Sequence, residues 1–393
     1  MKTRILFSLM ASLLVVLALN SSCDDPVNPP PDPPTPPGGG DPPDPPIVTV
    51  DSLGTSISEI TFTSGKDACL IVVQTNTNWT ASENADWLSL SASSGSKNTG
   101  FLIGATKNTT FKREATVTIN AGDKSKAIKV TQAGASLISV QVKEVTLNLV
   151  LVEGGNFTMG SNENSDFGVA HQVALSDFYI TETEVTNAVW KSVRGTLPYT
   201  DHDENGLPDL PVSETTWDGI TADFLPALNQ LTGKTFKLPT EAQWEYAALG
   251  GKKSNAYNYA GSNTLEDVGW YYRNSGWQKN PVGLKEPNEL GIYDMSGNVT
   301  EWCRDWYHPY YGFTVDNNVL SVPDLQTDPT GPATGTRKVV RGGDFMATDY
   351  WGSSRCHVKY RDSIHPSGYD STSYNQTITF YSINTGFRLV LTP

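Results

Sequence analysis

The stretch NELGIYDMSGNVTEWCRDWY, residues 288–307, carries the pattern that decides the fold of the larger part of this chain. Its glycines, Gly291 and Gly297, stand among polar residues that are common where a chain reverses direction. Its tryptophans, Trp302 and Trp306, supply large apolar surfaces suited to a core. We therefore predict a domain whose core is filled by aromatic side chains from short strands and long ordered loops.

The same texture, rich in glycine and tryptophan, extends over residues 142–393. Two helices are predicted within this region. The first covers residues 218–231, where apolar residues recur at helical spacing, and Gly233 follows its end. The second begins at Thr240, a residue type that caps helix N-termini, and ends at Gly250-Gly251. Short strands and loops are expected elsewhere.

Five further motifs accompany the stretch 288–307. They are GGNFTMGS (154–161), HQVALSDFYITETEVTNAVW (171–190), KLPTEAQWEYAALGG (237–251), VVRGGDF (339–345) and NTGFRLV (384–390). In order and spacing these motifs resemble the formylglycine-generating enzyme, or sulfatase-modifying factor, family. The resemblance implies that residues 142–393 form an α+β domain with a variant of the C-type lectin fold. A shared fold does not by itself establish a shared activity.

The oxidase of this family holds copper(I) with two cysteines, one four positions after the Gly-Gly pair and one five positions later, because copper(I) prefers soft thiolate ligands. Here those positions are Ala347 and Gly352, and Asp344 replaces the usual serine after Gly343. No cysteine lies between Gly343 and Cys356. The five histidines also lack the spacing of an iron site. Copper and formylglycine formation are therefore not expected, and no catalytic residue is assigned.

Two cysteines have a structural interpretation. Cys303 and Cys356 occupy places where non-catalytic relatives of the family carry a paired cysteine, so the resemblance implies a disulfide between them. An exported chain can keep such a bond oxidised. On this interpretation neither cysteine takes part in chemistry.

Two segments are candidate calcium sites, since both offer the oxygen ligands that Ca²⁺ prefers. The resemblance implies that the first uses one side chain, two backbone carbonyls and a glutamate, which are Asp294, Gly297, Val299 and Glu301. The second, DHDENGLPD (201–209), follows the first half of a calcium loop with Asp201, Asp203, Asn205 and Asp209. Position twelve of that loop is Val212 rather than Glu, and an ordinary tight turn is the alternative at either place.

Residues 344–384 combine aromatic side chains with Ser, Asp, Asn and Thr, a mixture that resembles a paratope. Similar surfaces occur in C-type-lectin-fold display proteins whose C-terminal ends are diversified. The candidate ligand-binding residues are Asp344, Asp349, Tyr350, Trp351, His357, Tyr369 and Tyr374. The alternative is that about half of the aromatics are core, and Tyr360, Phe380 and Phe387 are assigned there.

Residues 47–135 contain short apolar or alternating runs separated by turn residues, a spacing typical of an antiparallel β-sandwich. The runs are SEITF (58–62), ACLIVVQT (68–75), GFLIGA (100–105), EATVTI (114–119) and KAIKVTQ (126–132). The segments NTNWTAS (76–82), ADWLSLSASSG (85–95) and VTQAGA (130–135) resemble the BACON domain, which implies an immunoglobulin-like fold. That family's name implies carbohydrate binding, but Trp79 and Trp87 are expected to anchor the core, which favours a spacer.

The N-terminus has the pattern of an export signal. Lys2 and Arg4 precede an apolar run, and the small pair Ser21-Ser22 stands before Cys23, so residues 1–22 are predicted to be a signal peptide. Cys23 resembles the lipidated cysteine of bacterial lipoproteins. Residues 24–46 hold 12 of the 25 prolines, so residues 23–46 are predicted to be a lipidated, disordered tether. We expect a multi-domain protein anchored by lipid at the outer membrane or cell surface.

The formal net charge is −14, and such a surface repels phosphate backbones, so a nucleic-acid partner is not expected. Three functions remain. The first is a surface protein that binds a glycan or a protein through residues 142–393. The second is a sulfatase-modifying oxidase, which the missing cysteines disfavour. The third is a structural lipoprotein of an envelope or gliding machine.

Overall fold

The computed structural model describes residues 52–198, 207–309, 314–316, 319–321, 325–348, 355–368 and 384–392. The predicted signal peptide, Cys23 and the tether lie outside these residues. No helix in the ranges described is long and apolar enough to cross a membrane.

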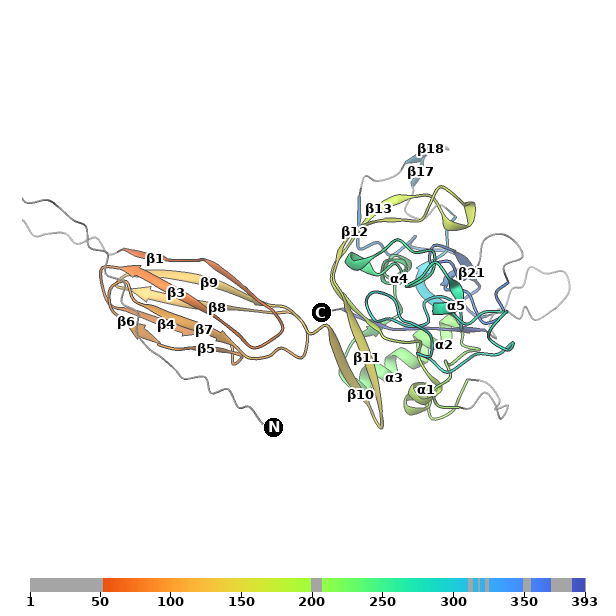
Figure 1. The fold of residues 1–393 in the computed structure, drawn as a ribbon, viewed down its shortest axis with the longest axis horizontal. Coiled ribbons are helices and arrows are strands. Elements are labelled where there is room, and N and C mark those ends of the chain that lie inside the picture. The colour runs from red at the N-terminus through yellow and green to blue at the C-terminus, as the bar shows by residue number, and fades with distance from the viewer. Residues whose placement is uncertain are drawn as a thin grey trace, which may run out of the picture. The chain divides into compact units, whose positions relative to one another are not determined.

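The N-terminal domain consists of two β-sheets that share one core (Figure 1). The four-stranded sheet has the order β1 (Leu53–Thr55), β3 (Asp67–Thr75), β7 (Gly100–Ala105) and β5 (Leu88–Leu90). The five-stranded sheet has the order β2 (Glu59–Phe62), β9 (Lys124–Gln132), β8 (Arg113–Ala121), β4 (Trp79–Glu83) and β6 (Ser94–Gly95). All five strands predicted from the sequence are confirmed, and along each of them side chains that face the core alternate with side chains that face outward.

Both tryptophans of this domain serve its core. Trp79 is buried between the sheets, packs on Phe101 with ring centroids 5.1 Å apart, and donates its indole N–H to the hydroxyl of Thr99 at 3.1 Å. Trp87 is half-buried against the same core, and the guanidinium of Arg113 lies 4.5 Å from its ring centroid. The prediction that both are core anchors is confirmed.

The C-terminal domain is built from small sheets linked by long loops. The largest has the order β10 (Leu137–Val142), β11 (Val145–Val152), β14 (Phe178–Thr181), β23 (Val390–Leu391) and β15 (Phe236–Lys237). A second has the order β21 (Asp362–Ile364), β20 (Lys338–Arg341), β16 (Thr300–Trp306) and β22 (Thr385–Gly386). A third joins β12 (Gly155–Met159), β13 (His171–Leu175) and β19 (Gln326–Thr327), and a hairpin joins β17 (Thr314–Asp316) to β18 (Val319–Ser321).

Both predicted helices are present. The first is one helical stretch made of α2 (Trp217–Gly219), the π-turn Ile220–Phe224 and α3 (Leu225–Thr232). It ends at Gly233 in the left-handed conformation. The second, α4 (Glu241–Ala248), begins with a capping box, in which Thr240 and Gln243 satisfy each other's backbone N–H groups.

The sequence analysis missed two helices of this domain. They are α1 (Asn187–Arg194) and the single turn α5 (Leu265–Val268). Thr186 caps α1 by accepting a hydrogen bond from the amide of Val189. Helices of this length carry too few apolar positions to show a clear period.

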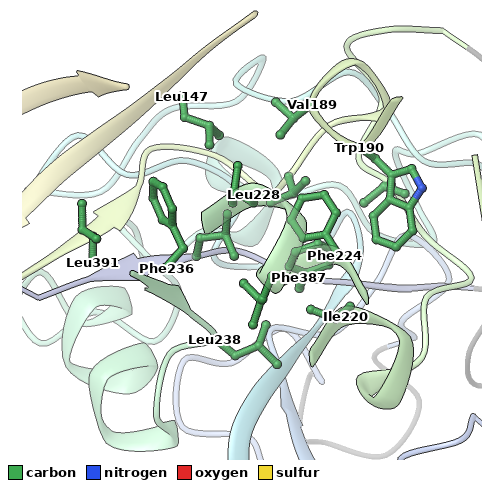
Figure 2. Packing of buried hydrophobic residues seen from close by; sticks show 14 of the residues in the cluster. Leu147, Val189, Trp190, Ile220, Phe224, Leu228, Phe236, Leu238, Phe387 and Leu391 are labelled. Atoms are coloured by element: carbon green, nitrogen blue, oxygen red, sulfur yellow. The ribbon is translucent and has the colours of Figure 1, made fainter. Parts of the chain in front are cut away.

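The main core of the domain joins segments far apart in the chain. The ring of Trp190, from α1, stacks on Phe224 with centroids 4.8 Å apart, and Phe387 meets Phe224 edge-on at 5.2 Å (Figure 2). The core assignment of Phe387 is therefore confirmed, whereas Phe380 lies outside the described residues. Trp302 is also buried, as predicted, and so are Trp244 and Tyr246, but Trp306 is only half-buried.

The predicted disulfide between Cys303 and Cys356 is wrong. Both side chains are fully buried, but they belong to different apolar clusters. Cys303, on β16, packs in the cluster that contains Trp244, and Cys356 packs beside Ala347 in a smaller one. Burial raises the pKa of the Cys303 thiol well above its usual range, so this thiol stays protonated and weakly reactive.

Peptide mapping without reduction should therefore find no peptide pair that joins Cys303 to Cys356. Iodoacetamide should label Cys303 only after the protein is denatured, because the thiol is both buried and protonated. A reductant should leave the melting temperature unchanged. A crosslinked pair in the map, or a lower melting temperature on reduction, would contradict this arrangement.

Candidate functional site

The turn after β20 is the place where the family resemblance puts the oxidase cysteines. Gly342 and Gly343 both have positive φ values, +93° and +69°. A Cβ at Gly343 would lie 2.8 Å from the backbone of Arg355, so only glycine fits this close approach. The turn closes when the Asp344 carboxylate accepts a hydrogen bond from the amide of Met346 at 2.8 Å.

Ala347 stands where the first copper-binding cysteine would be. Its side chain is buried in a small apolar cluster with Leu265, Tyr271 and Cys356. The second cysteine position, Gly352, lies outside the described residues. A methyl group packed among apolar side chains offers no ligand to copper, so this position cannot supply the soft thiolate that copper(I) requires.

A cavity of about 20 Å³ lies beside Asp344, and Thr300, Arg355 and Tyr360 also line it. This volume holds about one water molecule and no organic substrate. Tyr360 was assigned to the core, and this assignment is wrong, because its half-buried side chain faces the cavity and bonds to Arg355.

The polar groups around this cavity already satisfy one another. Burial raises the pKa of Asp344, and hydrogen bonds from Met346, Asn384 and Thr300 together with the charge of Arg355 oppose that rise. Asp344 therefore has its partners within the protein and shapes the turn.

His357 was predicted beside Asp344 as a ligand-binding residue, but it has a different environment. Its ring stacks on Phe167 with centroids 4.3 Å apart, and Nδ1 accepts a hydrogen bond from the amide of Lys359 at 3.0 Å. Burial, followed by the charges of Lys359 and Arg341, lowers its pKa to about 4. His357 is thus neutral at pH 7, and it does not line the cavity beside Asp344. The other candidates, Asp349, Tyr350, Trp351, Tyr369 and Tyr374, lie outside the described residues.

A buried group of two glutamates and two arginines borders the turn, because Arg341 directly precedes Gly342. Glu241 and Glu245 come from α4, Arg341 ends β20, and Arg361 precedes β21. Arg361 binds Glu241 with two hydrogen bonds, Nε to Oε1 at 2.6 Å and Nη2 to Oε2 at 2.8 Å. Arg341 pairs with Glu245 and lies 3.6 Å from Glu241, and the second oxygen of Glu245 accepts the amide of Gly160 at 2.8 Å.

The charges of this group balance. Burial alone would raise the pKa of Glu241, but the charge and hydrogen bonds of Arg361, together with the charge of Arg341, bring it below its ordinary value. The same partnership raises the pKa of Arg361. Glu241 and Arg361 therefore stay ionised as a mutually paired carboxylate and guanidinium, which is how a buried ion pair becomes tolerable.

A second buried cluster surrounds Arg388, whose side chain is fully enclosed. Arg388 binds Glu301 through Nε to Oε2 at 2.6 Å and Nη2 to Oε1 at 2.7 Å, and Trp244 donates its indole N–H to Oε2 of Glu301 at 2.8 Å. Glu184 and Asp294 are the other carboxylates near this guanidinium. Three carboxylates thus lie around this guanidinium, and the buried ammonium of Lys279 also acts on Glu184.

This arrangement does not fit the calcium ligand set that the resemblance implies. Both oxygens of Glu301 already accept hydrogen bonds from Arg388, so this carboxylate is paired with a cation of the protein itself. Among the residues that the structure describes, no group of three or more His, Cys, Asp or Glu side chains could hold a metal ion. In the second predicted site, Asp209 is exposed, and Asp201, Asp203 and Asn205 lie outside the described residues.

Burial raises the pKa of Asp294 to about 6 and that of Glu184 well above its usual range. Asp294 accepts the amide of Gly283 through Oδ2 at 2.7 Å, whereas its buried Oδ1 has no hydrogen-bond partner. An excess of buried carboxylates over cations is relieved by a bound proton. We therefore expect this cluster to carry a proton near pH 6.

The sequence analysis missed the loop WYYRNSGWQ, residues 270–278. This loop is hydrogen-bonded to the candidate site at two places. The amide of Tyr272 donates to the carbonyl of Ala347 at 3.3 Å, and the Ser275 hydroxyl donates to the carbonyl of Phe345 at 2.8 Å. The signal that could have revealed it is its density of aromatic residues beside a glycine.

Comparisons with known families match both domains. The model of the sulfatase-modifying factor enzyme 1-like domain matches residues 135–393, and that of the BACON domain, described as a putative N-terminal binding domain, matches residues 77–133.

Comparisons with individual proteins point to relatives with different names. The chain is 37% identical over 216 residues to chaperone protein LppX of Paenibacillus barcinonensis. The matched region spans 42% of this chain and 74% of LppX. It is 29% identical over 297 residues to a formylglycine-generating enzyme of Streptomyces coelicolor, spanning 58% of this chain and 87% of the enzyme. The solved structure of Treponema denticola variable protein 1 has a TM-score of 0.52 and 27% identity, and covers 66% of this chain and 100% of that protein.

Replacing Glu241 with Gln should lower the free energy of unfolding by about 3–5 kcal/mol, because the change leaves Arg361 buried without its full counter-charge. Urea titration at pH 7 measures the loss. Glu163→Gln is the matched control, since Glu163 is exposed, and should stay within about 0.5 kcal/mol of the parent.

The same glutamate gives a pH dependence. Its folded-state pKa lies below its ordinary value of 4.5, so its contribution is complete above that value and is lost as the pH falls below it. The acid side of the stability curve should therefore flatten in Glu241→Gln. An equally steep curve would contradict the ion pair.

Replacing Asp294 with Asn should leave stability at pH 7.5 unchanged or higher, because Asn mimics the protonated carboxyl. In the parent, the raised pKa of Asp294 gives stability that is present below its ordinary pKa of 3.8 and lost as the pH rises through about 6. Asp294→Asn should remove that loss. EDTA should leave the melting temperatures of the parent and of Asp294→Asn unchanged. If EDTA lowered the melting temperature of the parent alone, a calcium site that uses Asp294 would be supported.

Proposed function

Because the chain belongs to the sulfatase-modifying factor enzyme 1-like family, we propose that it uses this domain to bind a ligand, a glycan or a protein, and not to oxidise a sulfatase cysteine. Family membership leaves the activity open, since two relatives of this chain are named a formylglycine-generating enzyme and a chaperone protein. The choice between ligand binding and oxidation therefore depends on the residues of the candidate site.

The observation that carries the proposal is the environment of Ala347. Its methyl group packs in an apolar cluster at the position of the first oxidase cysteine, and the cavity beside Asp344 has a volume of about 20 Å³. A copper oxidase needs two thiolates and room for a peptide. The described part of the site offers neither.

The solved relative supports a binding role for the same fold. Treponema denticola variable protein 1 is called a variable protein, and this chain covers its full length. A rigid scaffold that carries variable loops suits recognition, because the loops can change while the core stays packed.

The placement of the protein forms part of this proposal. A signal peptide at residues 1–22, lipidation at Cys23 and a proline-rich tether would hold the binding domain away from the outer membrane, at the cell surface. The BACON domain, an immunoglobulin-like sandwich in this proposal, would act as a spacer. Its two tryptophans support this role, because Trp79 is buried and Trp87 is covered by Arg113.

An oxidase assay separates the two functions. The full mature chain, incubated with copper and a peptide that contains CxPxR, should leave the peptide mass unchanged, whereas the Streptomyces coelicolor enzyme should convert the peptide under the same conditions. Mass spectrometry of the peptide is the readout. Conversion by this chain would overturn the proposal in favour of the oxidase.

The second arm of the test measures binding. The same protein should retain at least one component of a glycan array or a panel of surface proteins, with affinity that is lost when residues 142–393 are deleted. Neutral and anionic polysaccharides are both included, so that charge attraction can be recognised. Failure to bind in both panels, together with fixed co-purification in an envelope complex, would favour a structural lipoprotein instead.

A further inference from the structure

Two aromatic side chains of the loop 270–278 stand out into solvent. Trp277 is 59% exposed and Tyr272 is 36% exposed. Their ring centroids lie 4.5 Å apart and their planes meet at 81°. Single exposed apolar residues are ordinary, but two exposed rings that meet nearly at a right angle form a corner of aromatic surface.

The backbone holds Trp277 in a conformation that bulky residues rarely adopt. Its φ is +67°, and the preceding Gly276 has a φ of +69°. Ser275 secures the turn, since its hydroxyl oxygen accepts the amide of Trp277 at 3.1 Å, and the side chain of Asn280 donates to its carbonyl at 3.1 Å. A strained backbone that presents an exposed indole points to a function for that side chain.

The corner lies next to the candidate site. Tyr272 and Ser275 are bonded to the backbone of Ala347 and Phe345, the segment that replaces the oxidase cysteines. Met346, between those two residues, is 44% exposed. The loop that carries the aromatic pair is therefore hydrogen-bonded directly to the segment Phe345–Ala347 of the candidate site.

The charged groups of this loop are already engaged. Lys279 donates to the hydroxyl of Ser213 at 2.9 Å, and Arg273 also has an interaction partner. Gln278, in contrast, is exposed and offers an amide that can both donate and accept. With a net charge of −14 on the chain, this surface suits an uncharged ligand better than an anionic one.

We propose that Tyr272 and Trp277 form a stacking platform for a neutral sugar ring, a site that rests on the binding function above and gives its ligand class. The apolar C–H face of a pyranose covers the indole, the tyrosine ring forms the side wall, and the amide of Gln278 bonds to a hydroxyl group. Stacking supplies the contact area, and the polar group sets orientation.

The experiment uses the full mature chain in native gels that contain one polysaccharide each. The neutral probes are xyloglucan, starch, galactomannan and yeast mannan, and the anionic comparison is polygalacturonate. Trp277→Ala and Tyr272→Ala should weaken binding to the retarding neutral polysaccharide by at least about tenfold, as expected for an aromatic anchor. Trp277→Phe should retain part of the affinity.

Leu284→Ala is the matched control, because Leu284 is also apolar and 63% exposed but carries no aromatic ring. It should bind as the parent does. All four variants should keep the parent's melting temperature to within about 2 °C, since exposed side chains contribute little to stability. Loss of binding in Leu284→Ala as well would show that the aromatic pair has no special role.

The outcomes separate this inference from the proposed function. Neutral polysaccharide binding that survives Trp277→Ala overturns the platform but leaves a binding protein. Retention by polygalacturonate alone, or by a protein in the panel alone, would contradict a neutral sugar as the ligand. The protein would still be a binding protein. No retention in any gel or panel overturns both.

Discussion

The C-terminal domain depends on one buried group of charges, the pairing of Glu241 and Glu245 on α4 with Arg341 and Arg361. It joins the helix to the end of β20 and to the start of β21, and so determines where the Gly342-Gly343 turn begins. Each member is buried, so the loss of one partner would leave a buried charge without its counter-charge. The loops of the candidate site start from this rigid base.

The base carries no chemistry of its own, which explains how one scaffold can support different functions. The turn beyond Gly343 is shaped by glycine conformation and by hydrogen bonds to Asp344, and neither requires a cysteine. Ala347 can therefore replace a copper ligand without loss of the fold. Next to this turn, the loop that carries Tyr272 and Trp277 presents two aromatic side chains to solvent.

The disulfide prediction, which is wrong, and the calcium prediction, whose Glu301 is paired with Arg388, have the same origin. A disulfide and a calcium site were inferred from the positions of Cys303, Cys356 and Glu301 along the chain. In the fold, the cysteines enter separate apolar clusters, and Glu301 pairs with Arg388, which lies 87 residues away. A local pattern shows which group is present, but the partner of a buried group depends on which distant strands meet.

The sequence by itself determined the features that have local causes. The strands of the N-terminal sandwich follow from alternation, the caps of α4 from Thr240 and Gln243, and the absence of an oxidase pair from the residues after Gly343. Only the tertiary structure decided the pairing of Glu241 with Arg361, 120 residues apart, the burial of Ala347 and the exposure of Trp277. Backbone preference acts over a few residues, whereas burial and charge pairing are settled when remote segments pack together.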